Sequence, residues 1–135
     1  MRNYFVFDTN ALISAHLKEG TTSALAFHKG LTEGIIAISD DTLREFATRF
    51  ARKKFDKYIS AADRAEAIIR LSRDCLLVNP SVAIKACRDP NDDMFLSLAV
   101  AIGAACIITR DLDLLTLHPF RGIPIVSPAD FLKSF

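Results

Sequence analysis

Short apolar runs that alternate with longer helical segments are the feature that most constrains the fold of this 135-residue chain. The first run, Tyr4–Phe7, is apolar at every position and meets the charged Asp8 at once. A continuous run of this kind is typical of a strand that is buried on both faces. We expect further strands at Ile35–Ile38, Leu76–Val78, Cys106–Ile108 and, at an edge because of Pro124, Ile123–Val126.

Helical patterns fill the intervals between these runs. We expect helices at Ala11–Lys18, Thr22–Leu31, Ser39 to about Lys54, from Ser60 onward, Asp89 to about Gly103, and from Ser127 onward. Strands that alternate with helices predict an α/β fold: a mainly parallel sheet of four to five strands, flanked by helices and joined by right-handed crossovers. The length fits one domain over residues 1–135.

Composition excludes several classes of protein. Half of the residues are hydrophobic and 24% are charged, which is ordinary for a globular protein. The three cysteines have no CxxC spacing, so we expect neither a disulfide framework nor a zinc site, and a reducing compartment. The longest mostly apolar stretch, Phe95–Ile108, is too short to span a membrane, and Tyr4–Phe7 is too short for a signal peptide. We therefore expect a cytoplasmic protein.

The charges are distributed unevenly although the net charge is only +1. Arg49–Lys57 holds five cations against one acid, whereas Asp89–Asp113 holds five carboxylates against Arg110. This separation is compatible with a phosphate-binding rim around a metal-binding centre. The alternative is that the basic segment is a solvated helix face.

Several acids follow the expected strands. Ligands of parallel sheets bind at the carboxyl ends of the strands, where Asp8 and Asp111 would lie. A single acid there commonly caps a helix, although Asn10 is the better-placed cap for the first helix. Several carboxylates together repel one another, by about 4 kcal/mol for a pair 4 Å apart at a dielectric constant near 20. They therefore favour a bound cation, and oxygen ligands suit Mg²⁺ or Mn²⁺.

Four segments, in order, resemble the motifs of PIN-domain ribonucleases. They are Phe7–Ser14, Ser39–Phe55 with Glu45, Asp89–Leu96, and Thr109–Leu115. The resemblance spans residues 4 to about 126, and similar chains are toxin components of toxin–antitoxin systems, including VapC-like ribonucleases.

The resemblance implies a set of functional residues. The implied catalytic carboxylates are Asp8, Glu45, Asp93 and Asp111, and the implied metal ligands are Asp8, Asp93, Asp111 and Asp113. Within Asp89–Asp93, a capping role explains Asp89 and a first-turn role explains Asp92, so Asp93 is the expected ligand and Asp92 its substitute. Helical periodicity alone places Glu45 on the polar face, where Arg49 would pair with it.

The implied activity is hydrolysis of RNA phosphodiester bonds by Mg²⁺ or Mn²⁺. The residues expected to orient the carboxylates are Thr9, Asn10, Asp92 and Thr109. Those expected to bind RNA phosphates are Arg49, Arg52, Lys53 and Lys54. The implied partners are RNA, an antitoxin protein and a second copy of the chain, with no membrane.

Three alternatives remain from the sequence. A phosphatase of the haloacid dehalogenase type would need an acid two residues after Asp8, where Asn10 stands. A phosphoacceptor receiver domain would need a lysine after the last strand, where Ser127 stands. The third alternative is a PIN-like domain that binds RNA without cleaving it.

Overall fold

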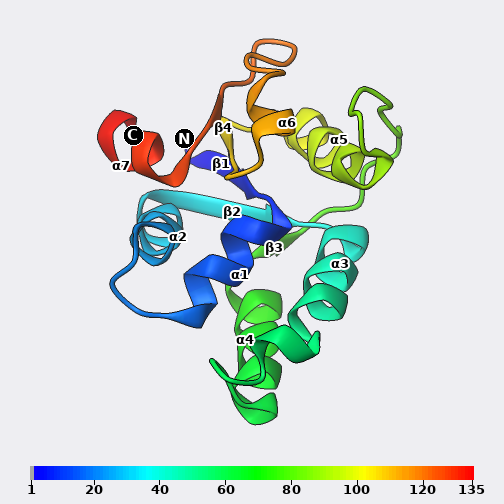
Figure 1. The fold of residues 1–135 in the computed structure, drawn as a ribbon. Helices are drawn as coiled ribbons and strands as arrows, with labels where there is room; N and C mark the ends of the chain where they lie inside the picture. Colours follow the sequence, from blue (N-terminus) through cyan, green and yellow to red (C-terminus); the bar gives the residue numbers. More distant parts are fainter. Residues whose placement is uncertain (1) are drawn as a thin grey trace.

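A computed structural model describes residues 2–135 and contains one parallel sheet in the order β3-β2-β1-β4-β5 (Figure 1). The strands are β1 (Asn3–Phe7), β2 (Gly34–Ile38), β3 (Leu76–Leu77), β4 (Cys106–Ile108) and β5 (Ile125–Val126). All four pairings between neighbouring strands are parallel. The expected α/β fold is therefore confirmed, and β5 lies at an edge as Pro124 predicts.

Seven α-helices connect the strands in the described part of the chain. They are α1 (Thr9–Leu17), α2 (Thr22–Glu33), α3 (Asp40–Phe50), α4 (Ala61–Asp74), α5 (Asp93–Ile102), α6 (Leu112–Leu115) and α7 (Pro128–Ser134). Two short 3-10 helices, Lys53–Phe55 and Pro90–Asp92, add single turns. Ser39, Ser60 and Ser127 cap α3, α4 and α7, because each hydroxyl accepts a hydrogen bond from a first-turn amide. No helix of residues 2–135 has the length and apolarity needed to cross a membrane.

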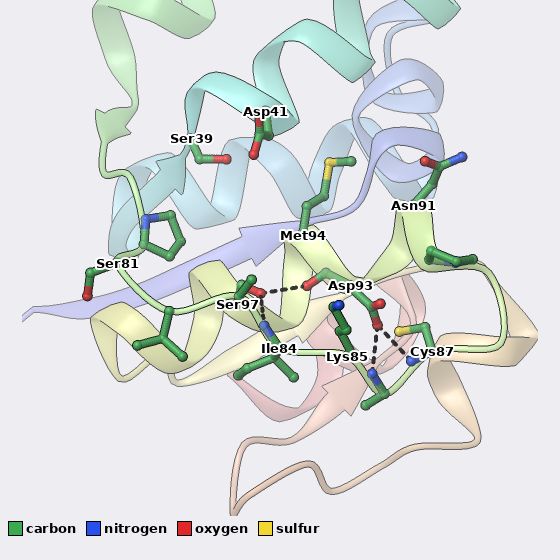
Figure 2. Close-up of a pocket in the computed structure, with 15 residues that line it drawn as sticks. Ser39, Asp41, Ser81, Ile84, Lys85, Cys87, Asn91, Asp93, Met94 and Ser97 are labelled. Atoms are coloured by element: carbon green, nitrogen blue, oxygen red, sulfur yellow. Dashed lines mark hydrogen bonds between the residues drawn. The ribbon is translucent and has the colours of Figure 1, made fainter.

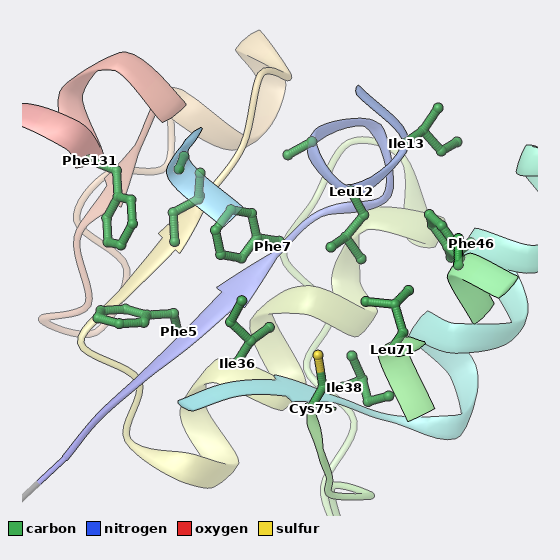
Figure 3. Close-up of a cluster of buried hydrophobic side chains, with 14 of the residues drawn as sticks. Phe5, Phe7, Leu12, Ile13, Ile36, Ile38, Phe46, Leu71, Cys75 and Phe131 are labelled. Atoms are coloured by element: carbon green, nitrogen blue, oxygen red, sulfur yellow. The ribbon is translucent and has the colours of Figure 1, made fainter. Parts of the chain in front are cut away.

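Both faces of the sheet are covered, which explains the continuous apolar strands. Phe5 and Phe7 point to one face, where they pack among side chains of α1, α2, α3, α4 and α7 (Figure 3). The rings of Phe5 and Phe131 meet edge to face at 5.0 Å, a favourable aromatic geometry. Val6 points to the opposite face, which is covered by α5 and α6. The sheet is thus the middle of three layers.

Two helix boundaries differ from the sequence expectation. Helix α1 begins at Thr9, not Ala11, so its N-cap is Asp8 and not Asn10. Helix α3 ends at Phe50 instead of continuing to Lys54. The break allows Phe55 to pack against Phe50 at 5.9 Å, whereas residues five apart in a continuous helix point to different faces.

The strand order creates a crevice at the middle of the sheet. Strand β1 pairs with β2 on one side and with β4 on the other. Strands β2 and β3 are therefore added on one side of β1, and β4 and β5 on the other side. In open parallel sheets such a switch point leaves a crevice at the carboxyl ends of the two strands, where ligands bind. The residues that follow β1 and β4 are therefore the first candidates for a functional site.

Candidate active site

Asp8, the residue directly after β1, is a buried carboxylate with only 3% of its surface exposed. Its Oδ1 accepts a hydrogen bond from the Ala11 amide at 2.9 Å, which caps α1. Its Oδ2 accepts a second one from the Thr109 hydroxyl at 2.6 Å. Burial nevertheless raises the pKa of Asp8 to about 6, because it disfavours the charge more than these hydrogen bonds and the nearby Arg49 favour it.

Thr109 joins the ends of β1 and β4. It is fully buried, and its hydroxyl both donates to Asp8 and accepts from the Asp111 amide at 2.9 Å. Asp111 in turn caps α6, since its Oδ1 accepts from the Asp113 amide at 2.9 Å. One threonine thus fixes the positions of two carboxylates from different strands.

Asp92 supplies a third carboxylate from the end of the 3-10 turn before α5. Its pKa is raised to about 7, first by burial and then by repulsion from Asp111 and Asp89, by a hydrogen bond to Asp111, and by repulsion from Asp8. The structure therefore brings together Asp8, Asp92 and Asp111, which we call the carboxylate cluster. Its members repel one another, and the pKa values of Asp8 and Asp92 are raised to about 6 and about 7.

Asp93 has a different role from the one expected of it. Its Oδ1 accepts hydrogen bonds from the amides of Ala86 at 2.9 Å and Cys87 at 2.7 Å (Figure 2). Burial acts to raise the pKa of Asp93, but these amides outweigh it and hold the pKa below its ordinary value. Asp93 thus anchors the loop before it, whereas Asp92 lies nearer to Asp8 and Asp111. Which of the two binds a metal stays a prediction, and these surroundings favour Asp92 over the expected Asp93.

Helical periodicity contains a signal that separates the two acids. Phe95, Leu96 and Ala99 form part of the buried face of α5, and they follow Asp92 by three, four and seven residues. Asp92 therefore shares the inward side of that helix, whereas Asp93 is turned about 100° away. The loop that supplies two amides to Asp93 gives no comparable signal in the sequence.

Glu45 lies on α3 and pairs with Arg49 at 3.6 Å. Both side chains are largely covered, with 25% and 30% of their surfaces exposed, and the charge of Arg49 lowers the pKa of Asp8. Arg49 is thus close enough to Asp8 to act on its charge, and Glu45 is the ion-pair partner of that arginine.

The remaining expected residues differ in their surroundings. Asp113 is exposed and lies 3.9 Å from Arg88, on the far side of the α6 turn from the cap at Asp111. Thr9 is buried, and its hydroxyl has no hydrogen-bond partner among residues 2–135. Asn10 is exposed. The expected phosphate-binding residues Arg52, Lys53 and Lys54 are exposed and form no ion pair in the described part of the chain.

The donor chemistry of the carboxylate cluster fits a hard divalent cation. All its donors are oxygens. Burial, and to a smaller extent repulsion among the three acids, raises the pKa values of Asp8 and Asp92, and a bound cation would offset the cost of charging them. Within residues 2–135, no three His, Cys, Asp or Glu side chains are already close enough together to form a metal cage. Binding would therefore require the carboxylates to draw together.

Two cavities flank this centre. One of about 860 Å³ lies between the start of α3, the loop of residues 80–87 and the start of α5, and it includes Asp93 but neither Asp8 nor Asp111 (Figure 2). The other, of about 630 Å³, is lined by residues that follow β1, β4 and β5. The carboxylates themselves lie outside the lining of both.

Comparison with known proteins gives a consistent result. A family model described as PIN domain matches residues 4–113. The uncharacterised protein MJ1680 from Methanocaldococcus jannaschii is 26% identical over 140 aligned positions, which cover 96% of this chain and 90% of that protein.

Solved structures show the same fold. VapBC2 from Rickettsia felis, bound to a DNA fragment from its promoter, aligns with a TM-score of 0.62 and 17% identity over 92% of this chain and 98% of the other. PAE2754 from Pyrobaculum aerophilum aligns with a TM-score of 0.64 and 16% identity over 97% and 88%.

Proposed function

This chain belongs to the PIN-domain family, and we propose that it is an endoribonuclease that hydrolyses RNA phosphodiester bonds with Mg²⁺ or Mn²⁺. The observation that carries the proposal is the carboxylate cluster at the switch point of the sheet, with raised pKa values at Asp8 and Asp92. The match to the PIN-domain family argues against the phosphatase and receiver-domain alternatives.

In this mechanism Asp8, Asp92 and Asp111 would hold the cation through their carboxylate oxygens. The cation would supply a Lewis acid for the activation of water and the neutralisation of charge on the scissile phosphate. Thr109 keeps Asp8 oriented by its 2.6 Å hydrogen bond. Glu45 forms an ion pair with Arg49, whose charge also acts on Asp8.

The basic segment after α3 supplies sequence-independent affinity for RNA. Arg52, Lys53 and Lys54 are exposed, follow directly from the helix that carries Glu45, and have no acidic partner in the described residues. Cations of this kind bind backbone phosphates and release counterions, so affinity falls as salt rises. They would hold the strand while the carboxylates act on one phosphate.

The direct test is cleavage of a labelled single-stranded RNA with Mg²⁺ or Mn²⁺. We expect activity in the wild type, loss of activity with EDTA, and loss of activity in Asp8→Asn. The matched control is Asp74→Asn, because Asp74 is exposed and lies just before β3 at the opposite, amino edge of the sheet. The control should cleave like the wild type.

Two results would count against the proposal. Equal cleavage by wild type and Asp8→Asn, or cleavage that survives EDTA, would exclude this centre as its source. Metal-independent RNA binding without any cleavage would instead favour the non-catalytic alternative, a PIN-like domain that only binds RNA.

The partners belong to the same proposal. The likeness to VapBC2 supports a role as the nuclease of a toxin–antitoxin pair. From the resemblance of the motifs we further propose an antitoxin protein that covers the site and a homodimer as the working form. Co-expression with the product of the neighbouring open reading frame, followed by size and activity measurements, tests this. A complex that is inactive on RNA is the expected result.

A further inference from the structure

The 630 Å³ cavity at the carboxyl edge of the sheet has an unusual lining, and we call it the Arg110 pocket. It lies between the end of α1, the start of α2, the residues after β4 and the start of α7. Its polar residues include Lys18, Arg110, Ser14, Thr21, Ser23 and Ser127, and no acid is among the lining residues. A pocket with two cations, several hydroxyls and no carboxylate favours an anion.

Arg110 is exposed at this cavity and makes one side-chain contact with α1. Its Nη1 donates a hydrogen bond to the Ser14 hydroxyl of α1 at 3.1 Å. The guanidinium has five donor hydrogens in a fixed fork, so most of them remain available after this one contact. It can therefore meet a phosphate with two parallel hydrogen bonds.

The start of α2 lies at the same cavity, where Thr21, Thr22 and Ser23 are among the lining residues. Helix α2 is 12 residues long, and its first amides lack intrahelical acceptors, although the Thr21 hydroxyl accepts a hydrogen bond from the Ala24 amide at 3.2 Å. The positive end of this helix therefore adds to the charges of Lys18 and Arg110 at the cavity.

The position of Arg110 links the pocket to the carboxylate cluster. Arg110 stands between Thr109, which binds Asp8, and Asp111, a member of the cluster. We propose that the Arg110 pocket binds a backbone phosphate of the RNA next to the phosphate that the carboxylates act on. This inference rests on the proposed function, and it gives the strand two basic contacts, one at the pocket and one at Arg52–Lys54.

The first experiment tests the pocket without RNA or metal. Inorganic phosphate is titrated into the protein in EDTA, and the backbone amides of residues 21–24, 109–110, 127 and 129 are followed by NMR. We expect saturable shifts at these amides, and an affinity about tenfold weaker in the double variant Lys18→Gln/Arg110→Gln. The matched control is Arg73→Gln, because Arg73 is an exposed arginine near the end of α4, at the opposite edge of the sheet.

The second experiment tests whether the anion is RNA. Cleavage of single-stranded RNA by the double variant should show a KM about tenfold higher with kcat within about twofold of wild type. The slope of log affinity against log salt should fall by about 0.7 for each lost phosphate contact. Arg73→Gln should change neither quantity, and thermal unfolding of the double variant should match the wild type.

The outcomes separate the two proposals. Absence of saturable phosphate shifts at the pocket, or equal shifts in the double variant, would refute the pocket as an anion site. Cleavage with unchanged KM in the double variant would refute its use by RNA and leave the proposed function standing. Phosphate binding in a wild type that cleaves no RNA would refute the proposed function and, with it, RNA as the source of the phosphate.

Discussion

Two adjacent regions of this molecule treat a carboxylate in opposite ways. In the carboxylate cluster, Asp92 faces Asp111 and Asp8, and its pKa is raised to about 7. In the loop that precedes α5, the next residue, Asp93, receives two backbone amides, and its pKa is lowered. Although the two residues are neighbours in the chain, the surroundings of Asp92 disfavour its negative charge and those of Asp93 stabilise it.

The difference teaches how to separate a structural acid from a functional one. An acid that stabilises the fold is surrounded by donors, as Asp93 is by the amides of Ala86 and Cys87. An acid placed for cation binding lies among other acids, which costs free energy until a cation arrives. The comparison therefore predicts that substitution of Asp92 lowers RNA cleavage, whereas substitution of Asp93 lowers the stability of the fold.

The largest expected effect is on cleavage by Asp92→Asn. Loss of a proposed cation ligand should lower kcat/KM for RNA on the order of 10³-fold, because several kcal/mol of charge stabilisation disappear from the transition state. Asp93→Asn keeps an oxygen that accepts from both amides, so its kcat/KM should fall less than about tenfold. Steady-state kinetics with saturating Mn²⁺ measure both.

The same two variants can refute the assignment of different roles to Asp92 and Asp93. If Asp93→Asn loses more activity than Asp92→Asn while both unfold at the wild-type temperature, the assignment of Asp92 to the cation is refuted. Circular dichroism on the same samples excludes misfolding as the cause of either loss.

A smaller loss of activity is expected from Thr109→Val. The substitution preserves shape but removes the hydroxyl that donates to Asp8 and accepts from the Asp111 amide. Groups that orient a metal ligand typically contribute 10–100-fold to activity, so we expect a loss in that range. Thr109→Ser keeps the hydroxyl and should restore most of the activity; similar losses in both variants would show that methyl packing is what matters.

Much of the fold is predictable from local pattern. Tyr4–Phe7 and Cys106–Ile108 are apolar at every position because both faces of the sheet are covered, and the helical segments begin at residues such as Ser39 with a side chain suited to capping. The break after Phe50 was missed because it depends on contact between Phe50 and Phe55, which the helical period does not contain. Tertiary packing decided that boundary.

The candidate site was predictable to a lesser extent. Asp8 and Asp111 follow strands, so sheet topology alone places them at one edge. Choosing between Asp92 and Asp93 required knowing that the loop of residues 84–87 folds back and presents its amides to Asp93, a contact across six and seven positions of irregular chain. Helical periodicity alone places Glu45 on a solvated face, and only the resemblance to PIN domains assigns it a catalytic role. In the structure Glu45 and Arg49 pair and are 25% and 30% exposed, a degree of burial that the helical period does not predict.

The comparison also predicts that loss of the Asp93 carboxylate lowers the free energy of unfolding. Asp93→Ala removes the acceptor of two amide hydrogen bonds, one of them to half-buried Cys87. We expect the free energy of unfolding to fall by about 1–2 kcal/mol, at the lower end for charged hydrogen bonds because water reaches the loop. Urea titration measures it, and Asp93→Asn serves as the control that retains the acceptor; an unchanged midpoint in Asp93→Ala would show that the loop does not depend on this residue.

The smallest expected effect is the dependence of metal-free stability on pH. Because folding raises the pKa of Asp92 from 3.8 to about 7, the native state binds the proton more tightly than the unfolded state does. This carboxyl therefore costs no stability below about pH 4, progressively more between pH 4 and 7, and its full cost above pH 7. Asp8, with a pKa of about 6, acts in the same direction. Half-buried His16 acts in the opposite direction, because desolvation lowers its pKa below 6.5 and its contribution to stability therefore rises with pH up to that value.

The difference between the stability–pH profiles of the wild type and Asp92→Asn reports on the Asp92 carboxyl alone, because His16 contributes equally to both profiles. In EDTA at pH 8, we expect Asp92→Asn to unfold a few degrees above the wild type, a shift limited by the solvent exposure of Asp92. At pH 4 the difference should nearly vanish, because the carboxyl is protonated in the native state and is close to its midpoint in the unfolded state, whose pKa is 3.8. Mn²⁺ at pH 8 should reverse the order, since only the wild type retains all three carboxylates that hold the cation. If Asp92→Asn is no more stable than the wild type at pH 8 without metal, burial and the neighbouring acids do not disfavour the charge of Asp92. The electrostatic contrast between Asp92 and Asp93 would then be wrong.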